Sequence, residues 1–125
     1  MTNRLPRILL AASAAILVLG SFMHTAAFNK VVAVVDSSNL PIFYGSSLKA
    51  LWLIDSATMI VLAVVFTLIA IRPVMARGLA VVLLALVPAA TSALLYIFIG
   101  MFIPAHMLLA SAVMAFLAGL LLSRG

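Results

Sequence analysis

The sequence predicts an all-α integral membrane protein, an antiparallel bundle of four transmembrane helices. Two observations lead to this class: 68% of the 125 residues are hydrophobic, and only 7% are charged. Soluble domains usually have about a quarter of their residues charged. Most of the apolar surface of this chain must therefore face lipid. We expect a single domain, residues 1–125, with the lipid bilayer as its main partner.

Four apolar runs are long enough to cross a bilayer. A hydrocarbon core of about 30 Å needs about 20 helical residues, and the backbone must be helical there because no water reaches it. The expected spans are residues 8–28, 48–71, 78–99 and 105–122. The first resembles a signal peptide but is longer than the usual apolar region, so we expect it to stay uncleaved.

The basic residues predict the orientation of these spans. With the N-terminus inside, the cytoplasmic side would carry five arginines and the outer side two lysines: Arg4, Arg7, Arg72, Arg77 and Arg124 against Lys30 and Lys49. Cytoplasmic loops favour positive charge. Both termini are thus expected in the cytoplasm, in an inner (plasma) membrane.

The net charge of +5 has no accompanying basic cluster, so nucleic-acid binding is not expected. The absence of cysteine excludes disulfides and thiolate metal sites.

The connections between the spans differ in length. Residues 72–77 form a tight turn with Pro73, which predicts that the second and third spans are antiparallel neighbours. Residues 100–104 form another tight turn, and Pro104 suits the first turn of the last helix.

Residues 29–47 form the one longer outer loop. Its β-branched stretch, residues 31–35, is followed by the turn-forming residues 36–39, which is consistent with a short β-hairpin. The same stretch could instead prolong the first helix. Ser46 or Ser47 is a suitable N-cap for the second span.

Three ionisable side chains are expected in the outer half of the bundle. At 1.5 Å per residue, His24 lies about 6 Å below the outer edge, Asp55 lies about 10 Å below it, and His106 is close to the edge. Ionisable groups at such depths are costly and indicate function. We therefore predict that these three residues, from three different spans, converge on an outward-facing polar pocket.

Further residues are expected to line this pocket. Trp52, Asp55, Ser56 and Met59 share one face of the second span at helical spacing. Tyr96 and several methionines lie at similar depth. The predicted ligand-binding set is His24, Trp52, Asp55, Ser56, Met59, Tyr96 and His106.

A small ligand or ion is the leading expectation for this pocket. His24, Asp55 and His106 could bind copper or another divalent metal, and nearby thioethers favour copper. Haem would need His24 and His106 on opposed helices. Alternatively, the polar groups only lock the bundle together. The sequence has no nucleophile elbow and no Ser/His pair at a fixed spacing, so no catalytic residue is predicted, although an acid/base pair of His24 and Asp55 is chemically possible.

A stripe of small residues on the last span, Ser111, Ala115 and Gly119, predicts close helix packing. It could serve a helix of the same chain, a second copy or a larger membrane complex. The alternative functions are therefore a non-catalytic structural or assembly subunit, and a dimeric proton-coupled transporter that uses Asp55.

Overall fold

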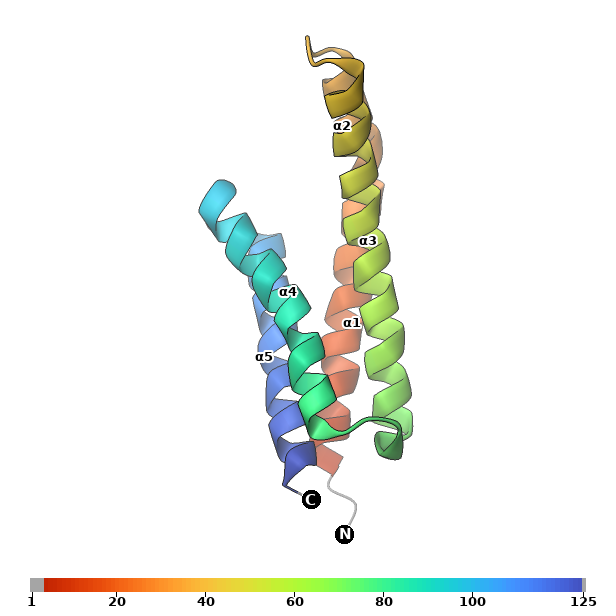
Figure 1. The fold of residues 1–125 in the computed structure, drawn as a ribbon, viewed down its shortest axis with the longest axis vertical. Coiled ribbons are helices and arrows are strands. Elements are labelled where there is room, and N and C mark those ends of the chain that lie inside the picture. The colour runs from red at the N-terminus through yellow and green to blue at the C-terminus, as the bar shows by residue number, and fades with distance from the viewer. Residues whose placement is uncertain (1–3, 125) are drawn as a thin grey trace.

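The computed structural model describes residues 4–124, and every regular element in that range is helical. The elements are α1 (Arg4–Ala26), α2 (Phe28–Asp36), α3 (Ile42–Ile71), the 3-10 turn η1 (Pro73–Met75), α4 (Gly78–Phe98) and α5 (Ile103–Ser123) (Figure 1). Four helices are long and apolar enough to cross a membrane: α1 continued by α2, then α3, α4 and α5. The predicted all-helical membrane class is confirmed.

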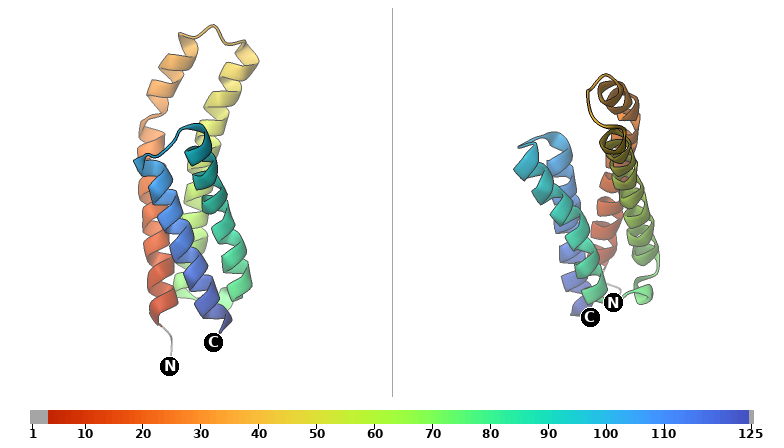
Figure 2. Two further views of the ribbon diagram at one scale, coloured as in Figure 1. Left: turned by 90° about the vertical axis from the view of Figure 1, so that its left-hand side faces the viewer. Right: turned by 45° about the horizontal axis from the view of Figure 1, so that its top comes forward.

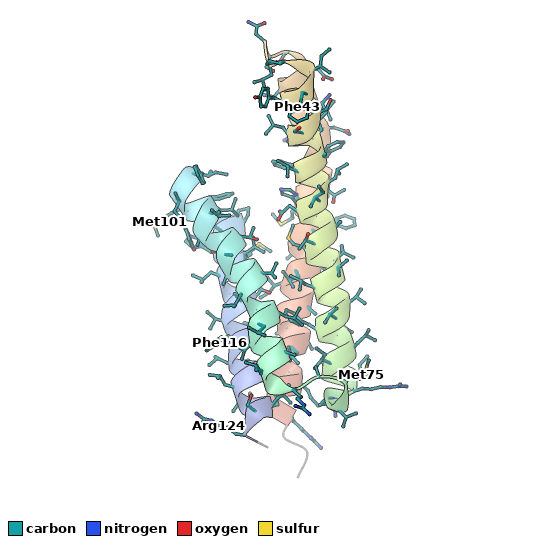
Figure 3. All side chains as sticks on the ribbon, in the orientation of Figure 1. Phe43, Met75, Met101, Phe116 and Arg124 are labelled. Carbon is teal, nitrogen blue, oxygen red and sulfur yellow. The ribbon has the colours of Figure 1, made fainter. Side chains whose placement is uncertain are left out.

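The outer surface of the bundle is apolar along its length. Large side chains such as Phe116 and Met101 point outward (Figure 3), and Met101 is 84% exposed. In water such a surface would cause aggregation. It is the surface that a lipid environment requires, so the chain is a multi-pass membrane protein.

The helices pack as two hairpins, α1 and α2 with α3, and α4 with α5, joined mainly through contacts between α1 and α5. The start of α1 and the end of α5 lie at one end of the bundle (Figure 1), and the other end is called the distal end here. The predicted contact between the second and third spans is wrong, because α3 and α4 contact each other little. Figures 1 and 2 show the hairpins diverging toward the distal end.

The predicted β-hairpin in residues 29–47 is not found; this segment is helical apart from the turn between α2 and α3. The alternative interpretation, in which residues 31–35 prolong the first helix, describes this segment better. A Cβ on Gly45 of α3 would lie 3.0 Å from Cγ1 of Val35. The absence of that atom lets α2 pack closely on α3.

The second span begins earlier than predicted. Helix α3 begins at Ile42, directly after Pro41, so neither Ser46 nor Ser47 is its N-cap. The hydroxyl of Ser47 instead donates to the carbonyl of Phe43 within the helix, at 2.7 Å.

The two hairpins differ in length. At 1.5 Å per residue, the 21 residues of α4 and of α5 measure about 31 Å, which matches a hydrocarbon core of about 30 Å. The 30 residues of α3 measure about 45 Å. Helix α2 and the first turns of α3 therefore project beyond the turn between α4 and α5 (Figure 2).

Small residues allow α5 to lie close to both α1 and α4. Ser111, Ala115 and Gly119 are all buried. Ser13 of α1 pairs with Ser111, with their hydroxyl oxygens 2.8 Å apart. A Cβ on Gly119 would lie 2.9 Å from the backbone nitrogen of Val82. The stripe is thus used within the chain, and an association with a second copy or a complex would need another surface.

An arginine ties α1 to the end of α3. The guanidinium of Arg7 donates from Nε to the carbonyl of Ala70 at 2.7 Å and from a terminal nitrogen to that of Ile71 at 3.4 Å. The last carbonyls of a helix lack backbone partners and attract positive charge. Arg7 therefore caps α3, a role that its place in the sequence did not indicate.

Candidate ligand cavity

A cavity of about 240 Å³ lies between the two hairpins, toward the distal end. Its walls come from α1, α3, α4, α5 and the α4–α5 turn, and His24 and Asp55 are its only ionisable residues. Its lining consists of Ile16, Gly20, Met23, His24, Ala27, Trp52, Asp55, Met59, Leu95, Ile99, Phe102, Pro104, Met107 and Leu108.

The polar wall of the cavity is organised around His24. Its Nδ1 lies 2.9 Å from the hydroxyl oxygen of Ser56. Its ring stacks on the indole of Trp52, with centroids 3.9 Å apart and planes 8° apart. The indole N–H also donates to the carbonyl of His24 at 2.8 Å. These contacts to α3 fix the imidazole in one orientation.

Asp55 faces the other nitrogen of this ring. Its Oδ2 lies 3.6 Å from Nε2 of His24, beyond the 2.7–2.9 Å typical of a charge-assisted hydrogen bond. The side chain is 32% exposed. The carboxyl group therefore lies near the imidazole without a hydrogen bond to it, and the partly exposed side chain lines the cavity.

Helical spacing explains why these groups meet. Ser56 and Met59 are buried on the face of α3 that packs on α1, and the hydroxyl of Ser21 donates to the carbonyl of Ser56 at 3.0 Å. Trp52 and Asp55 flank this face and reach the cavity. The predicted shared face of the second span agrees with this arrangement.

The structure does not bring His106 to the other two groups. Its Nδ1 lies 2.6 Å from the hydroxyl oxygen of Tyr96, and neither residue lines the cavity. The reason is the rotation of α5: Ala105 and Leu108 are buried in the bundle, which leaves the His106 side chain exposed. The predicted convergence of three ionisable groups is therefore wrong, because His24 and Asp55 lie together and His106 lies apart from them.

The predicted metal triad does not assemble either. Within residues 4–124, no three side chains of the His, Cys, Asp or Glu type lie close enough together to hold a metal ion. The bis-histidine arrangement that haem would need is not formed, since His106 is paired with Tyr96.

Sequence reasoning missed the apolar walls that α4 and α5 contribute. Leu95, Ile99 and Phe102 line the cavity, but in a chain so rich in apolar residues nothing marks these three. Gly20, in contrast, is expected from helical spacing, because it shares a face of the first span with His24. It leaves room at the cavity wall, because a Cβ there would lie 3.4 Å from Sδ of Met59.

Comparison of the chain with protein-family models, curated proteins and solved structures gave no match.

Proposed function

We propose that this membrane protein binds a small molecule in the cavity between its hairpins. The observation that carries the proposal is the polar pair His24 and Asp55, which opens into an otherwise apolar cavity. Ligand pockets usually combine apolar walls with a few placed polar groups. A purely structural polar pair would be expected to form a closed hydrogen bond, whereas Asp55 lies 3.6 Å from His24 and its side chain stays partly exposed.

The orientation proposed for the protein puts both termini in the cytoplasm of a cell with an inner membrane. In support, all five arginines belong to the terminal end of the bundle or to the α3–α4 connection, and Lys30 and Lys49 belong to the distal segments. By the positive-inside rule the arginine-rich end is cytoplasmic. The cavity would then face the outer side.

The binding proposal can be tested with small aromatic fragments of neutral, cationic and anionic type. A ligand that binds only the folded state raises its stability, so at least one fragment should raise the melting temperature of the detergent-solubilised protein in a saturable way. Gly20→Leu would fill the cavity, since its side chain meets flexible methionines, and should abolish the rise. His106→Asn should not, because His106 lies outside the cavity.

Two results would contradict the binding proposal. One is that no fragment stabilises the wild-type protein. The other is that the same fragments stabilise a folded Gly20→Leu variant equally well, which would place their binding elsewhere.

A structural or assembly subunit is the second candidate, and the projecting distal segment favours it. No residue of α2 is buried, and Ile42 and Phe43 at the start of α3 are 89% and 74% exposed. Exposed apolar groups of this kind often mark interaction surfaces. If this candidate holds, Ile42→Ser with Phe43→Ser would reduce chemical crosslinking to other chains in membranes. Unchanged crosslinking would contradict it.

Proton-coupled transport through Asp55 stays a prediction.

A further inference from the structure

The charge of the cavity narrows the class of ligand. Asp55 is one of only two acidic residues in the chain, and no lysine or arginine lines the cavity. From α1 the only titratable group facing it is His24; α4, α5 and their turn contribute apolar residues alone. An ionised carboxylate in such surroundings lacks a full counter-charge, and uncompensated charge at membrane depth is costly.

The hydrogen bonding of His24 is compatible with an ionised Asp55. In the tautomer in which Ser56 donates to Nδ1, the neutral ring carries its proton on Nε2, facing Oδ2 of Asp55. At 3.6 Å this N–H is too far from the carboxylate to form a hydrogen bond with it. The carboxylate of Asp55 can therefore still accept a hydrogen bond or an ion pair from a positively charged group in the cavity.

The rest of the cavity suits an apolar body of variable shape. Three methionines line it, and two of them lie beside Gly20: a Cβ there would lie 3.4 Å from Sδ of Met59 and 4.0 Å from Cε of Met107. Methionine is flexible and polarisable, and it adapts to different partners. The indole of Trp52 adds an aromatic surface beside the carboxylate.

The size of the cavity limits the ligand further. A cavity of about 150 Å³ holds a benzene molecule, so the 240 Å³ here accommodates one aromatic ring with a short branched substituent. An inorganic cation such as Mg²⁺ or Ca²⁺ would need several oxygen ligands, and the cavity offers one carboxylate.

We propose that the cavity binds a lipophilic organic cation, with its ammonium group against Asp55 and its apolar body between Met59 and Met107. The inference rests on the proposed binding function and specifies the ligand class. The attraction between ammonium and carboxylate replaces the missing counter-charge, and the apolar walls exclude water and strengthen it.

The test uses the full-length protein in phosphatidylcholine vesicles and the fluorescence of Trp52, the only tryptophan, which lines the cavity. The probes are benzyltrimethylammonium and neopentylbenzene, which have the same shape but differ in charge, each corrected for partition into empty vesicles. The cation should give a saturable change. Loss of a charged partner makes binding about tenfold weaker or worse, so neopentylbenzene should bind at least that much less tightly.

Two variants locate the effect. Asp55→Asn should weaken binding of benzyltrimethylammonium by about tenfold or more and leave neopentylbenzene unaffected. Asp36→Asn is the matched control, because it removes the other acidic group, which pairs with Lys49 in the projecting distal segment outside the cavity, and should change neither affinity. If Asp55→Asn does not fold, the comparison of the two probes on the wild-type protein decides alone.

The possible results separate the two proposals. Equal binding of the charged and neutral probes, or a folded Asp55→Asn variant that binds the cation normally, would overturn the organic-cation inference and leave the cavity a binding site. A response to cuprous ion without one to benzyltrimethylammonium would overturn it too. Failure of all fragments to stabilise the wild-type protein would remove the binding function itself.

Discussion

The imidazole of His24 and the indole of Trp52 lie face to face, 3.9 Å apart, while the indole N–H donates to the backbone carbonyl of the same histidine. That carbonyl belongs to the last turn of α1, where helix carbonyls lack partners from their own backbone. Trp52 thus completes the end of one helix and holds the ring that faces Asp55. The end of α1 and the orientation of the His24 ring in the cavity therefore both depend on Trp52.

Replacing Trp52 should therefore separate stacking from hydrogen bonding. Trp52→Phe keeps an aromatic ring beside His24 but removes the N–H, so we expect the free energy of unfolding to fall by about 1 kcal/mol. Trp52→Leu also removes the stacking and should cost more. Unfolding by SDS in mixed micelles, followed by circular dichroism, measures both. Stability equal to wild type in the two variants would show that the carbonyl does not need this donor.

The Ser13–Ser111 pair should show measurable coupling between α1 and α5. The Ser13 hydroxyl lies 2.8 Å from that of Ser111 and 3.0 Å from the carbonyl of Ser111, all buried. Hydrogen bonds between membrane helices couple by about 0.6 kcal/mol on average. A double-mutant cycle of Ser13→Ala, Ser111→Ala and the double variant should give a coupling free energy of that order. Ser47→Ala, on an exposed part of α3, is the control, and purely additive effects of the buried pair would speak against the bond.

Alanine at Gly119 should destabilise the hairpin of α4 and α5. The new Cβ would lie 2.7 Å from Cγ2 and 2.9 Å from the nitrogen of Val82, and backbone cannot move aside as a side chain can. Overpacking of this kind typically costs about 1–3 kcal/mol. Thermal unfolding in detergent measures the loss.

Gly20→Ala is the matched control for this prediction. The same change there meets only side-chain atoms of methionine at 3.4 Å or more, and alanine is favoured over glycine in a helix by about 1 kcal/mol. The variant should be as stable as wild type or more so. If both alanine variants behave alike, close approach at Gly119 is not what holds the hairpin.

Arg7→Ala should loosen the end of α3. It removes two donors from the carbonyls of Ala70 and Ile71, and charged hydrogen bonds contribute about 1.5–3 kcal/mol when well formed and less when partly exposed. We expect faster hydrogen–deuterium exchange in the last turn of α3 and η1. Arg4→Ala is the control, because it removes the same charge from an exposed neighbouring residue and should leave this exchange rate unchanged. If Arg4→Ala increases the exchange rate equally, the effect comes from the loss of charge and not from the capping hydrogen bonds.

The sequence by itself determined the class of the protein and the number of its membrane-spanning helices, because apolar content and the length of an apolar run can be read from local sequence. It also identified the face of α3 that carries Trp52, Asp55, Ser56 and Met59, since helical spacing fixes which residues share a face.

Only the tertiary structure decided which hairpins form, that α2 continues the first helix, and that His106 pairs with Tyr96 away from the cavity. The physical reason is that lipid-facing and buried surfaces are both apolar in a membrane helix, so hydropathy does not reveal how a helix is rotated. Rotation follows from close packing at small residues such as Gly119 and Ser111, and from the few polar contacts between helices.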